Sequence, residues 1–219
     1  MPDLYTFGEA MALFLASDTD SVLTARTYTR STAGAEGNVA VGVTRLGLSA
    51  HFFTLMGNDQ LGSAVLADFA AEGVDVSGVK RVDSFSSAMI RNPGTTAPVE
   101  ASYLRKGAAA SLMTPADLDQ QVIAQSRWLH ATGITCAIST NAAETVSAGL
   151  ESARKHGIKK SFDLIFAANC GVNKRRALSL NRLLGMLICS SVAKMNIAQS
   201  LELAMDKKRF ASPLLEIIQ

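Results

Sequence analysis

The chain alternates between segments with the pattern of a buried strand and segments with the pattern of a helix. Apolar runs predict strands at His51 to Met56 and Ile158 to Leu164. Apolar residues at helical spacing predict helices at Leu61 to Ala71 and Asn141 to His156, each closed by a nearby glycine. Regular alternation of this kind implies a parallel sheet covered by helices, so the fold is predicted to be α/β.

The remaining segments keep this rhythm with one exception. Further strands are predicted at Leu4 to Phe7, Met11 to Leu15 and Trp128 to Ile134, and further helices at Val39 to Leu46 and from Thr114 onward. The exception is Phe85 to Arg105, where two short strand-like pieces flank the turn Pro93-Gly94, as in a β-hairpin. We interpret this segment as a small lid beside the sheet.

The composition is that of a globular protein in a reducing compartment. With 219 residues, 48% of them hydrophobic and 18% charged, the chain can bury one large core. Its three cysteines are an odd number without paired metal-ligand spacing, which disfavours a disulfide framework or a zinc site. The N-terminus lacks a basic region before an apolar run, and no window is apolar enough to span a membrane. We therefore expect a cytoplasmic protein with no membrane partner.

The net charge of +2 conceals two different regions. Up to Leu164 there are 13 basic and 16 acidic residues, whereas after it there are 8 basic and 3 acidic residues. The basic clusters Lys174 to Arg176 and Lys207 to Arg209 are short and lack interleaved aromatic residues. Stacking platforms for bases are therefore missing, and nucleic acid is not an expected partner.

Ligands of open α/β sheets bind beyond the carboxyl ends of the strands, so the junctions between strand and helix are the places to search. At Gly34 to Asn38, small residues would let a ligand approach the backbone, and the carboxamide of Asn38 offers a donor and an acceptor. This combination suits a polyhydroxylated ligand. The alternative is structural, with Gly34 and Gly37 shaping a turn and Asn38 capping a helix.

Several motifs occur in a characteristic order. They are Gly8-Glu9, Ala33 to Ala40, Arg45 to Gly47, Met56 to Gly62, Tyr103 to Ser111, Leu129 to Ile134 and Ser161 to Leu164. The first four resemble the N-terminal signature of the ribokinase-like (PfkB) carbohydrate kinases. The last three are similar to the 2-keto-3-deoxygluconate kinase branch of that family. The likeness covers about three quarters of the chain.

The resemblance implies a three-layer ribokinase-like fold with a central, mostly parallel sheet and a small β lid, formed by segments of about 12–32 and 84–108. It implies ATP-dependent phosphorylation of 2-keto-3-deoxygluconate with Mg²⁺, and pairing of two copies through their lids. The substrate-binding residues that it implies are Gly34, Ala35, Glu36, Gly37, Asn38, Tyr103, Leu104 and Arg105.

Arg105 is the expected partner of a substrate carboxylate, because a guanidinium fork matches two carboxylate oxygens and keeps its charge at working pH. Tyr103 would add a hydroxyl contact. Judged by spacing alone, Arg105 could equally be an ordinary solvated residue on a lid strand. Where relatives often have an aromatic residue on the preceding lid strand, this chain has Ser87 to Met89, so that contact is not expected here.

The chain departs from the family after Leu164. The family's Gly-Ala-Gly-Asp, which supplies an anion hole and the Asp that deprotonates the attacking hydroxyl, has no counterpart among the 219 residues. We therefore expect no catalytic residue, no retained ATP-binding residue and no activity. The predicted division is 1–164 as the N-terminal part of a kinase domain, truncated on its C-terminal side, and 165–219 as a tail outside the family.

A shifted reading frame would explain this tail. Relatives continue with Asn-Ile-Arg-Arg-Lys-Leu-Trp, which can be written AAT ATT CGC CGC AAA CTG TGG. Loss of the first base regroups these codons as ATA TTC GCC GCA AAC TGT GG, which encodes Ile165 to Gly171 of this chain.

The sequence leaves three other functions open. One is a non-catalytic sugar-acid-binding or interaction protein, and another is a fructokinase-like relative. A nucleotide-dependent oxidoreductase is disfavoured, because no Gly-x-Gly-x-x-Gly follows the first strand. His51, His130 and His156 lie on separate predicted elements, so no metal site is expected from them.

Overall fold

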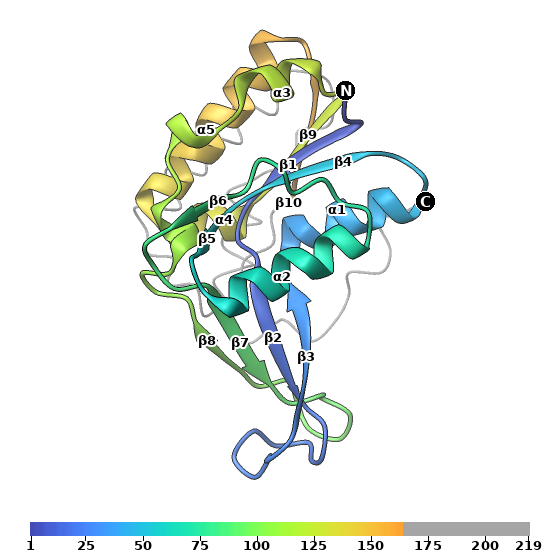
Figure 1. Ribbon diagram of the computed structural model, residues 1–219, viewed down its shortest axis with the longest axis vertical. Coiled ribbons are helices and arrows are strands. Elements are labelled where there is room, and N and C mark those ends of the chain that lie inside the picture. The colour runs from blue at the N-terminus through green and yellow to red at the C-terminus, as the bar shows by residue number, and fades with distance from the viewer. Residues whose placement is uncertain (164–219) are drawn as a thin grey trace, which may run out of the picture.

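The computed structural model describes residues 1–163, which form a layered α/β body and a β lid (Figure 1). The central sheet contains β1 (Leu4–Phe7), β4 (Ala50–Phe53), β9 (Trp128–Thr132) and β10 (Lys159–Asp163) in the order β10-β9-β1-β4. All three strand pairs in this sheet are parallel, which confirms the prediction from the alternating pattern. The predicted tail at 165–219 lies outside the described residues.

Helices cover both faces of this sheet. On one face lie α1 (Ala35–Arg45) and its neighbour α2 (Gln60–Ala71), as Figure 1 shows. On the other face lie α3 (Gln120–Gln125) and α5 (Thr140–Lys155), while the short α4 (Gly133–Ile138) connects β9 to α5. The result is the three-layer arrangement that the resemblance implies.

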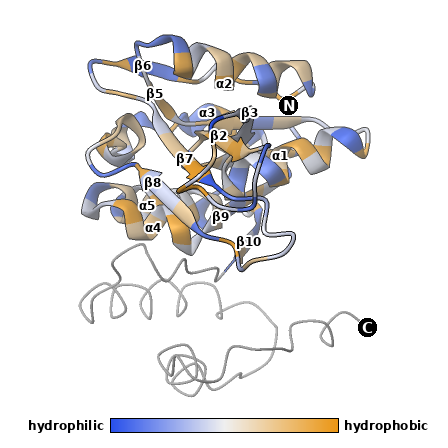
Figure 2. Cartoon of the chain, turned by 90° about the horizontal axis from the view of Figure 1, so that it is seen from below, coloured by the Kyte–Doolittle hydropathy of each residue, from blue (hydrophilic) through white to orange (hydrophobic). Residues whose placement is uncertain are grey.

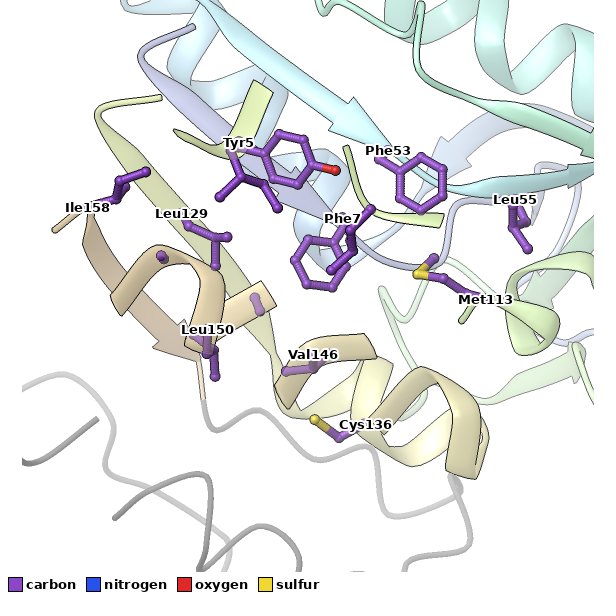
Figure 3. Packing of buried hydrophobic residues seen from close by; sticks show 14 of the residues in the cluster. Tyr5, Phe7, Phe53, Leu55, Met113, Leu129, Cys136, Val146, Leu150 and Ile158 are labelled. Atoms are coloured by element: carbon purple, nitrogen blue, oxygen red, sulfur yellow. The ribbon is translucent and has the colours of Figure 1, made fainter. Parts of the chain in front are cut away.

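The core lies in two clusters, because successive residues of a strand point to opposite faces of a sheet. Tyr5 and Phe7 of β1 pack with Leu129 of β9 and with Val146 and Leu150 of α5 (Figure 3). On the opposite face, the second cluster joins the sheet to α1 and α2 and includes Leu4, Ala40, Phe52, Val65 and Phe69. In Figure 2 the helices that cover the sheet carry both hydrophobic and hydrophilic residues, as expected for helices with one buried side.

The lid is a second, four-stranded sheet. It contains β2 (Met11–Ala16), β3 (Tyr28–Ala33), β7 (Ser87–Arg91) and β8 (Ala101–Leu104) in the order β3-β2-β7-β8. The pair β7–β8 is antiparallel, as the hairpin prediction requires, and β2 pairs with β7 in parallel. Since β2 follows β1 after only three residues, the lid projects from the carboxyl end of the central sheet (Figure 1).

Some elements differ from the sequence prediction. The predicted run His51 to Met56 is divided into β4 and β5 (Leu55–Gly57), and β5 pairs with β6 (Lys80–Val82), which the pattern did not indicate. The strand predicted as Trp128 to Ile134 ends at Thr132, because the hydroxyl of Thr132 accepts a hydrogen bond from the backbone N–H of Ile134 (3.2 Å) and caps α4.

The helix predicted from Thr114 is also shorter than expected. Thr114 and Asp117 form a reciprocal capping pair around a single 3₁₀ turn, Pro115–Asp117, which follows another 3₁₀ turn at Ala109–Leu112. The next helix, α3, begins after its own cap, Asp119. Among residues 1–163, no helix is long and apolar enough to cross a membrane.

Candidate functional site

The carboxyl ends of β1 and β9, the first turn of α1 and the base of the lid meet at one edge of the central sheet. Glu9 follows β1 closely, Gly34 immediately precedes α1, and Arg105 immediately follows β8. Parallel strands bring their carboxyl ends to the same edge, which is why these residues converge despite their separation in the sequence.

Gly34 forms the tight turn between the lid strand β3 and α1. Its φ of +151° is a conformation that residues with a side chain rarely adopt, and a Cβ placed on it would lie 2.6 Å from the backbone oxygen of Glu9. The turn therefore passes directly against the end of β1. Gly34 occupies the N-cap position of α1, so this helix begins without a capping side chain.

Glu36 lies beneath this turn and is completely buried. Its Oε1 accepts hydrogen bonds from the hydroxyls of Thr132 (2.7 Å) and Thr135 (2.5 Å) at the start of α4. Burial raises the pKa of Glu36 and outweighs the two hydroxyl bonds, which favour the carboxylate. The side chain of Glu36 thus joins α1 to α4, and its carboxyl group is excluded from solvent.

The other three residues of the turn have different surroundings. Ala35 is half-buried, and Gly37 is buried where a Cβ would lie 2.5 Å from the ring of Phe69 on α2. Asn38 is exposed, and its carboxamide makes no hydrogen bond to any other residue in 1–163. The alternative that Asn38 caps the helix is wrong, because Gly34 holds the cap position and Asn38 lies in the first turn. Asn38 therefore offers its polar atoms outward.

On the lid, Tyr103 and Arg105 share one face of the β8 segment and Leu104 lies on the other, as strand alternation requires. Leu104 is 56% exposed, whereas the guanidinium of Arg105 stacks over the ring of Tyr103 with 5.4 Å to the centroid. The structure brings Tyr103 and Arg105 toward the strand ends and leaves Leu104 on the opposite face.

Arg105 forms an ion pair with Glu9 through its Nη2 and the Oε2 of the carboxylate. The side chain of Glu9 is only 2% exposed and that of Arg105 only 13% exposed. The second carboxylate oxygen of Glu9 accepts a hydrogen bond from the hydroxyl of Ser87 on β7 (2.7 Å). Burial raises the pKa of Glu9, although Arg105 and Ser87 both favour its ionised form.

Sequence reasoning placed Glu9 in a motif and not among the site residues. The available signal was its position, since a carboxylate that follows the first strand of a parallel sheet lies at the ligand-binding edge. The pairing with Arg105 gave no local signal, because the two residues are far apart in the chain.

A neighbouring junction has a different character. Asp59, the N-cap of α2, accepts hydrogen bonds from the backbone N–H of Gly62 (2.6 Å) and from the hydroxyl and backbone N–H of Ser86 (both 2.8 Å). Its carboxylate is thus used within the protein.

The described residues do not supply a metal centre. Within 1–163, no group of three or more His, Cys, Asp or Glu side chains is close enough to hold a metal ion. Each histidine has a separate partner, namely Asp75 for His51, Ser161 for His130 and the backbone oxygen of Ser152 for His156.

Comparison with known proteins gives a consistent result. The family model of the pfkB family carbohydrate kinases matches residues 1–199. The 2-dehydro-3-deoxygluconokinase of Bacillus subtilis (strain 168) is 34% identical over 163 residues, which is 74% of this chain and 50% of that protein. The 2-dehydro-3-deoxygalactonokinase of Haloferax volcanii is 31% identical over 163 residues, or 74% of this chain and 51% of that protein.

Solved structures show the same likeness. The PfkB protein from Polaromonas sp. JS666 is 34% identical with a TM-score of 0.79, covering 84% of this chain and 62% of that one. The 2-dehydro-3-deoxygluconokinase from Thermotoga maritima is 25% identical with a TM-score of 0.78, covering 83% of this chain and 56% of that one. The chain spans about half the length of the curated relatives that it matches.

Proposed function

Because this chain belongs to the pfkB family of carbohydrate kinases, we propose that residues 1–163 contain the sugar-acid-binding part of a kinase domain for 2-keto-3-deoxygluconate, also called 2-dehydro-3-deoxygluconate. The proposal assigns substrate contacts to Asn38 in the first turn of α1 and to Tyr103 and Arg105 of the lid. It is supported by the observation that Gly34 and Arg105 both lie against Glu9. Glu9 connects the two parts, since its backbone oxygen lies against Gly34 and its carboxylate pairs with Arg105.

Each of these groups suits one part of a sugar acid. The carboxamide of Asn38 can donate to one hydroxyl and accept from another, which a polyol requires. The guanidinium of Arg105 can pair with the substrate carboxylate, and the ring of Tyr103 supports it from below. In this proposal Glu36 and Gly37 shape the turn from inside, and Gly34 and Ala35 allow the ligand to approach the backbone. Leu104, on the other face of β8, has the weakest case for substrate contact.

Phosphoryl transfer needs an anion hole, a base and a nucleotide site besides the sugar site. ATP is the phosphoryl donor expected for the family, with Mg²⁺ as its metal cofactor, and the fructokinase of Xylella fastidiosa, 25% identical, has been crystallised with bound ATP. No Gly-x-Gly-Asp, the motif that supplies the anion hole and the base in the family, occurs in the 219 residues. We therefore propose that these 219 residues bind the sugar acid and, by themselves, do not phosphorylate it.

Calorimetric titration of the full chain with 2-keto-3-deoxygluconate and with fructose tests the substrate class, and a coupled assay of ATP consumption tests transfer. We expect the sugar acid to bind more tightly than fructose and ATP not to be consumed. Equal binding of both sugars would favour a fructokinase-like relative, and ATP consumption dependent on the sugar acid would refute the inactive assignment.

The Arg105→Met variant isolates the carboxylate contact. A charge-assisted pair contributes about 1.5–3 kcal/mol, so affinity for the sugar acid should fall at least about tenfold while affinity for fructose changes little. Arg91→Met, a change on the lid strand β7, is the matched control and should leave both affinities unchanged. Equal losses for the two sugars in Arg105→Met would refute the carboxylate role.

Two further proposals concern parts that the described residues do not test. We propose that 165–219 is read out of frame, supported by the charge change and by the codon regrouping after Leu164, although the family match continues to residue 199. Sequencing the gene around the codon for Leu164 tests it, and a downstream sequence with no compensating frame would refute it.

We also propose pairing of two copies through the lid, which sedimentation of the purified chain can measure.

A further inference from the structure

In the ion pair with Arg105, the carboxylate of Glu9 occupies the position at the guanidinium that a substrate carboxylate would take. Glu9 comes from the end of β1 and Arg105 from the end of β8, so this pair joins the central sheet to the lid. Both side chains are largely excluded from water, and Ser87 holds the other oxygen of Glu9. A buried pair of this kind is strongly coupled to its surroundings, because little solvent screens it.

Acidic groups outnumber basic groups around this pair. Among residues 1–163, the charged groups that face Glu9 are Arg105 from the lid and Glu36 from α1, while Ser87 of β7 contributes a neutral hydroxyl. Glu36 is itself completely buried, and its Oε1 is already hydrogen-bonded to Thr132 and Thr135. A substrate carboxylate beside Arg105 would be a second carboxylate at this guanidinium, in addition to that of Glu9.

We propose that Glu9 holds the guanidinium of Arg105 in place of the substrate, and that binding of a sugar acid at Arg105 is coupled to the uptake of one proton by Glu9. This inference rests on the proposed sugar-acid function and extends it to specificity. The proton comes from solvent and forms an O–H bond on the Glu9 carboxyl group, and no other covalent bond changes. A neutral sugar brings no second carboxylate, so its binding takes up no proton at Glu9.

The physical reason is that two carboxylates sharing one buried site cannot both stay ionised at low cost. Burial already raises the pKa of Glu9, and a neighbouring anion raises that pKa further. Between the pKa of Glu9 in the free protein and its higher value in the complex, affinity for the acid falls as pH rises. One coupled proton gives a dependence of up to about tenfold per pH unit in that window.

Titration calorimetry of the full chain measures this coupling directly. 2-Keto-3-deoxygluconate is titrated at several pH values, in pairs of buffers that differ in their enthalpy of ionisation, and fructose is titrated in parallel. For the wild-type chain we expect proton uptake with the sugar acid and none with fructose. In Glu9→Gln the uptake should disappear, the affinity for the acid should become independent of pH, and at the alkaline end it should exceed that of the wild type.

Glu36→Gln is the matched control, because it removes the neighbouring buried carboxyl group and leaves the pair of Glu9 and Arg105 in place. It should retain the proton uptake. Uptake that persists in Glu9→Gln, or that disappears in Glu36→Gln alone, would overturn the proposal, as would the absence of uptake in the wild type when the acid binds.

Failure of the proposed function has a different signature. If neither sugar binds the wild-type chain, the sugar-acid assignment is refuted, and the pair is then examined without ligand. Unfolding of Glu9→Gln, Arg105→Met and the double variant forms a cycle in which the two residues should be coupled by roughly tenfold in the unfolding equilibrium constant. Additive effects would show that Glu9 does not hold Arg105, and the inference would fail independently of any substrate.

Discussion

The helices α1 and α2 lie side by side on the same face of the sheet, and they begin in opposite ways (Figure 1). The start of α2 is closed by Asp59, whose carboxylate accepts hydrogen bonds from Gly62 and Ser86. The start of α1 is Gly34, which has no side chain, and the nearby carboxyl group of Glu36 is turned inward to Thr132 and Thr135. The carboxamide of Asn38 is the exposed polar group of this turn.

This difference separates a structural junction from a candidate binding junction. At α2 the polar atoms satisfy one another, so stability and local geometry account for the motif from Gly57 to Gly62. At α1 the buried side chain of Glu36 holds the turn from the protein interior, while Asn38 is exposed to solvent. A polar residue in such a motif is thus a candidate ligand contact only when the protein has not already used its hydrogen bonds.

The largest effect on stability is expected at the start of α1. In Gly34→Ala the new Cβ would meet the backbone oxygen of Glu9 at 2.6 Å in a conformation that alanine rarely adopts. We expect the free energy of unfolding to fall by about 3 kcal/mol, measured by chemical denaturation.

Gly42→Ala is the matched control in the same helix, because nothing lies within 4 Å of a Cβ at that position. This change should be neutral or should stabilise the protein by up to about 1 kcal/mol, as alanine favours helix. A Gly34→Ala variant as stable as Gly42→Ala would mean that the turn does not press against the end of β1.

The second effect concerns α2. Asp59→Ala removes the cap and leaves Ser86 without its acceptor, so the unfolding free energy should fall by about 2 kcal/mol. Burial opposes ionisation of Asp59, but the bonds from Gly62 and Ser86 prevail and lower its pKa. The contribution of ionised Asp59 to stability is therefore present at pH values above the usual pKa of a carboxyl group, and it is lost as pH falls through the lowered pKa. Sugar-acid affinity should be unchanged; a large loss of affinity in a folded variant would make both junctions part of the site.

Local patterns in the sequence predicted the central sheet because β1, β4 and most of β9 are buried runs, whose residues enter two cores on opposite faces. The same reasoning could not find β3, since Tyr28–Ala33 is polar and largely exposed. That strand is held by pairing with β2 and by the contact of Arg30 and Thr32 with Asp68 on α2. Such partners lie far away in the sequence and leave no periodic signal.

The site shows the same limit. The sequence indicated the turn from Gly34 to Asn38 and the lid residues Tyr103 and Arg105, and in the structure Gly34 and Arg105 both lie against Glu9. The inward orientation of Glu36 depends on Thr132 at the end of β9 and Thr135 in α4, and the pairing of Arg105 depends on Glu9. The sequence shows that a polar side chain is present at a junction. Which hydrogen-bond or ion-pair partner that side chain takes is decided by the tertiary structure.

The third effect is smaller, and its sign depends on pH. Burial raises the pKa of Glu36 above its ordinary value of 4.5, so the wild-type chain loses stability as pH rises through the folded-state pKa. Glu36→Gln keeps an acceptor for the two threonine hydroxyls and cannot ionise. Its stability relative to the wild type should therefore increase as pH rises from acid values.

Unfolding by denaturant at a series of pH values measures this difference. Glu144→Gln, on the exposed side of α5, is the control, and its stability should follow that of the wild type across the series. If the difference in unfolding free energy between Glu36→Gln and the wild type stayed constant with pH, burial would not be raising the pKa of Glu36 in the folded protein.

The smallest effect on stability, and the sharpest test of the comparison, is expected at Asn38. Its side chain is exposed and makes no hydrogen bond within residues 1–163, so Asn38→Ala should change the unfolding free energy by less than about 0.5 kcal/mol. Two lost hydrogen bonds to the sugar correspond to about tenfold or more in affinity, for the acid and for a neutral sugar alike. Asn58→Ala, a change of an exposed asparagine just before the N-cap of α2, should alter neither stability nor affinity. Because the two asparagines are alike in exposure, equal affinities for these variants would show that the open start of α1 is not where the sugar binds.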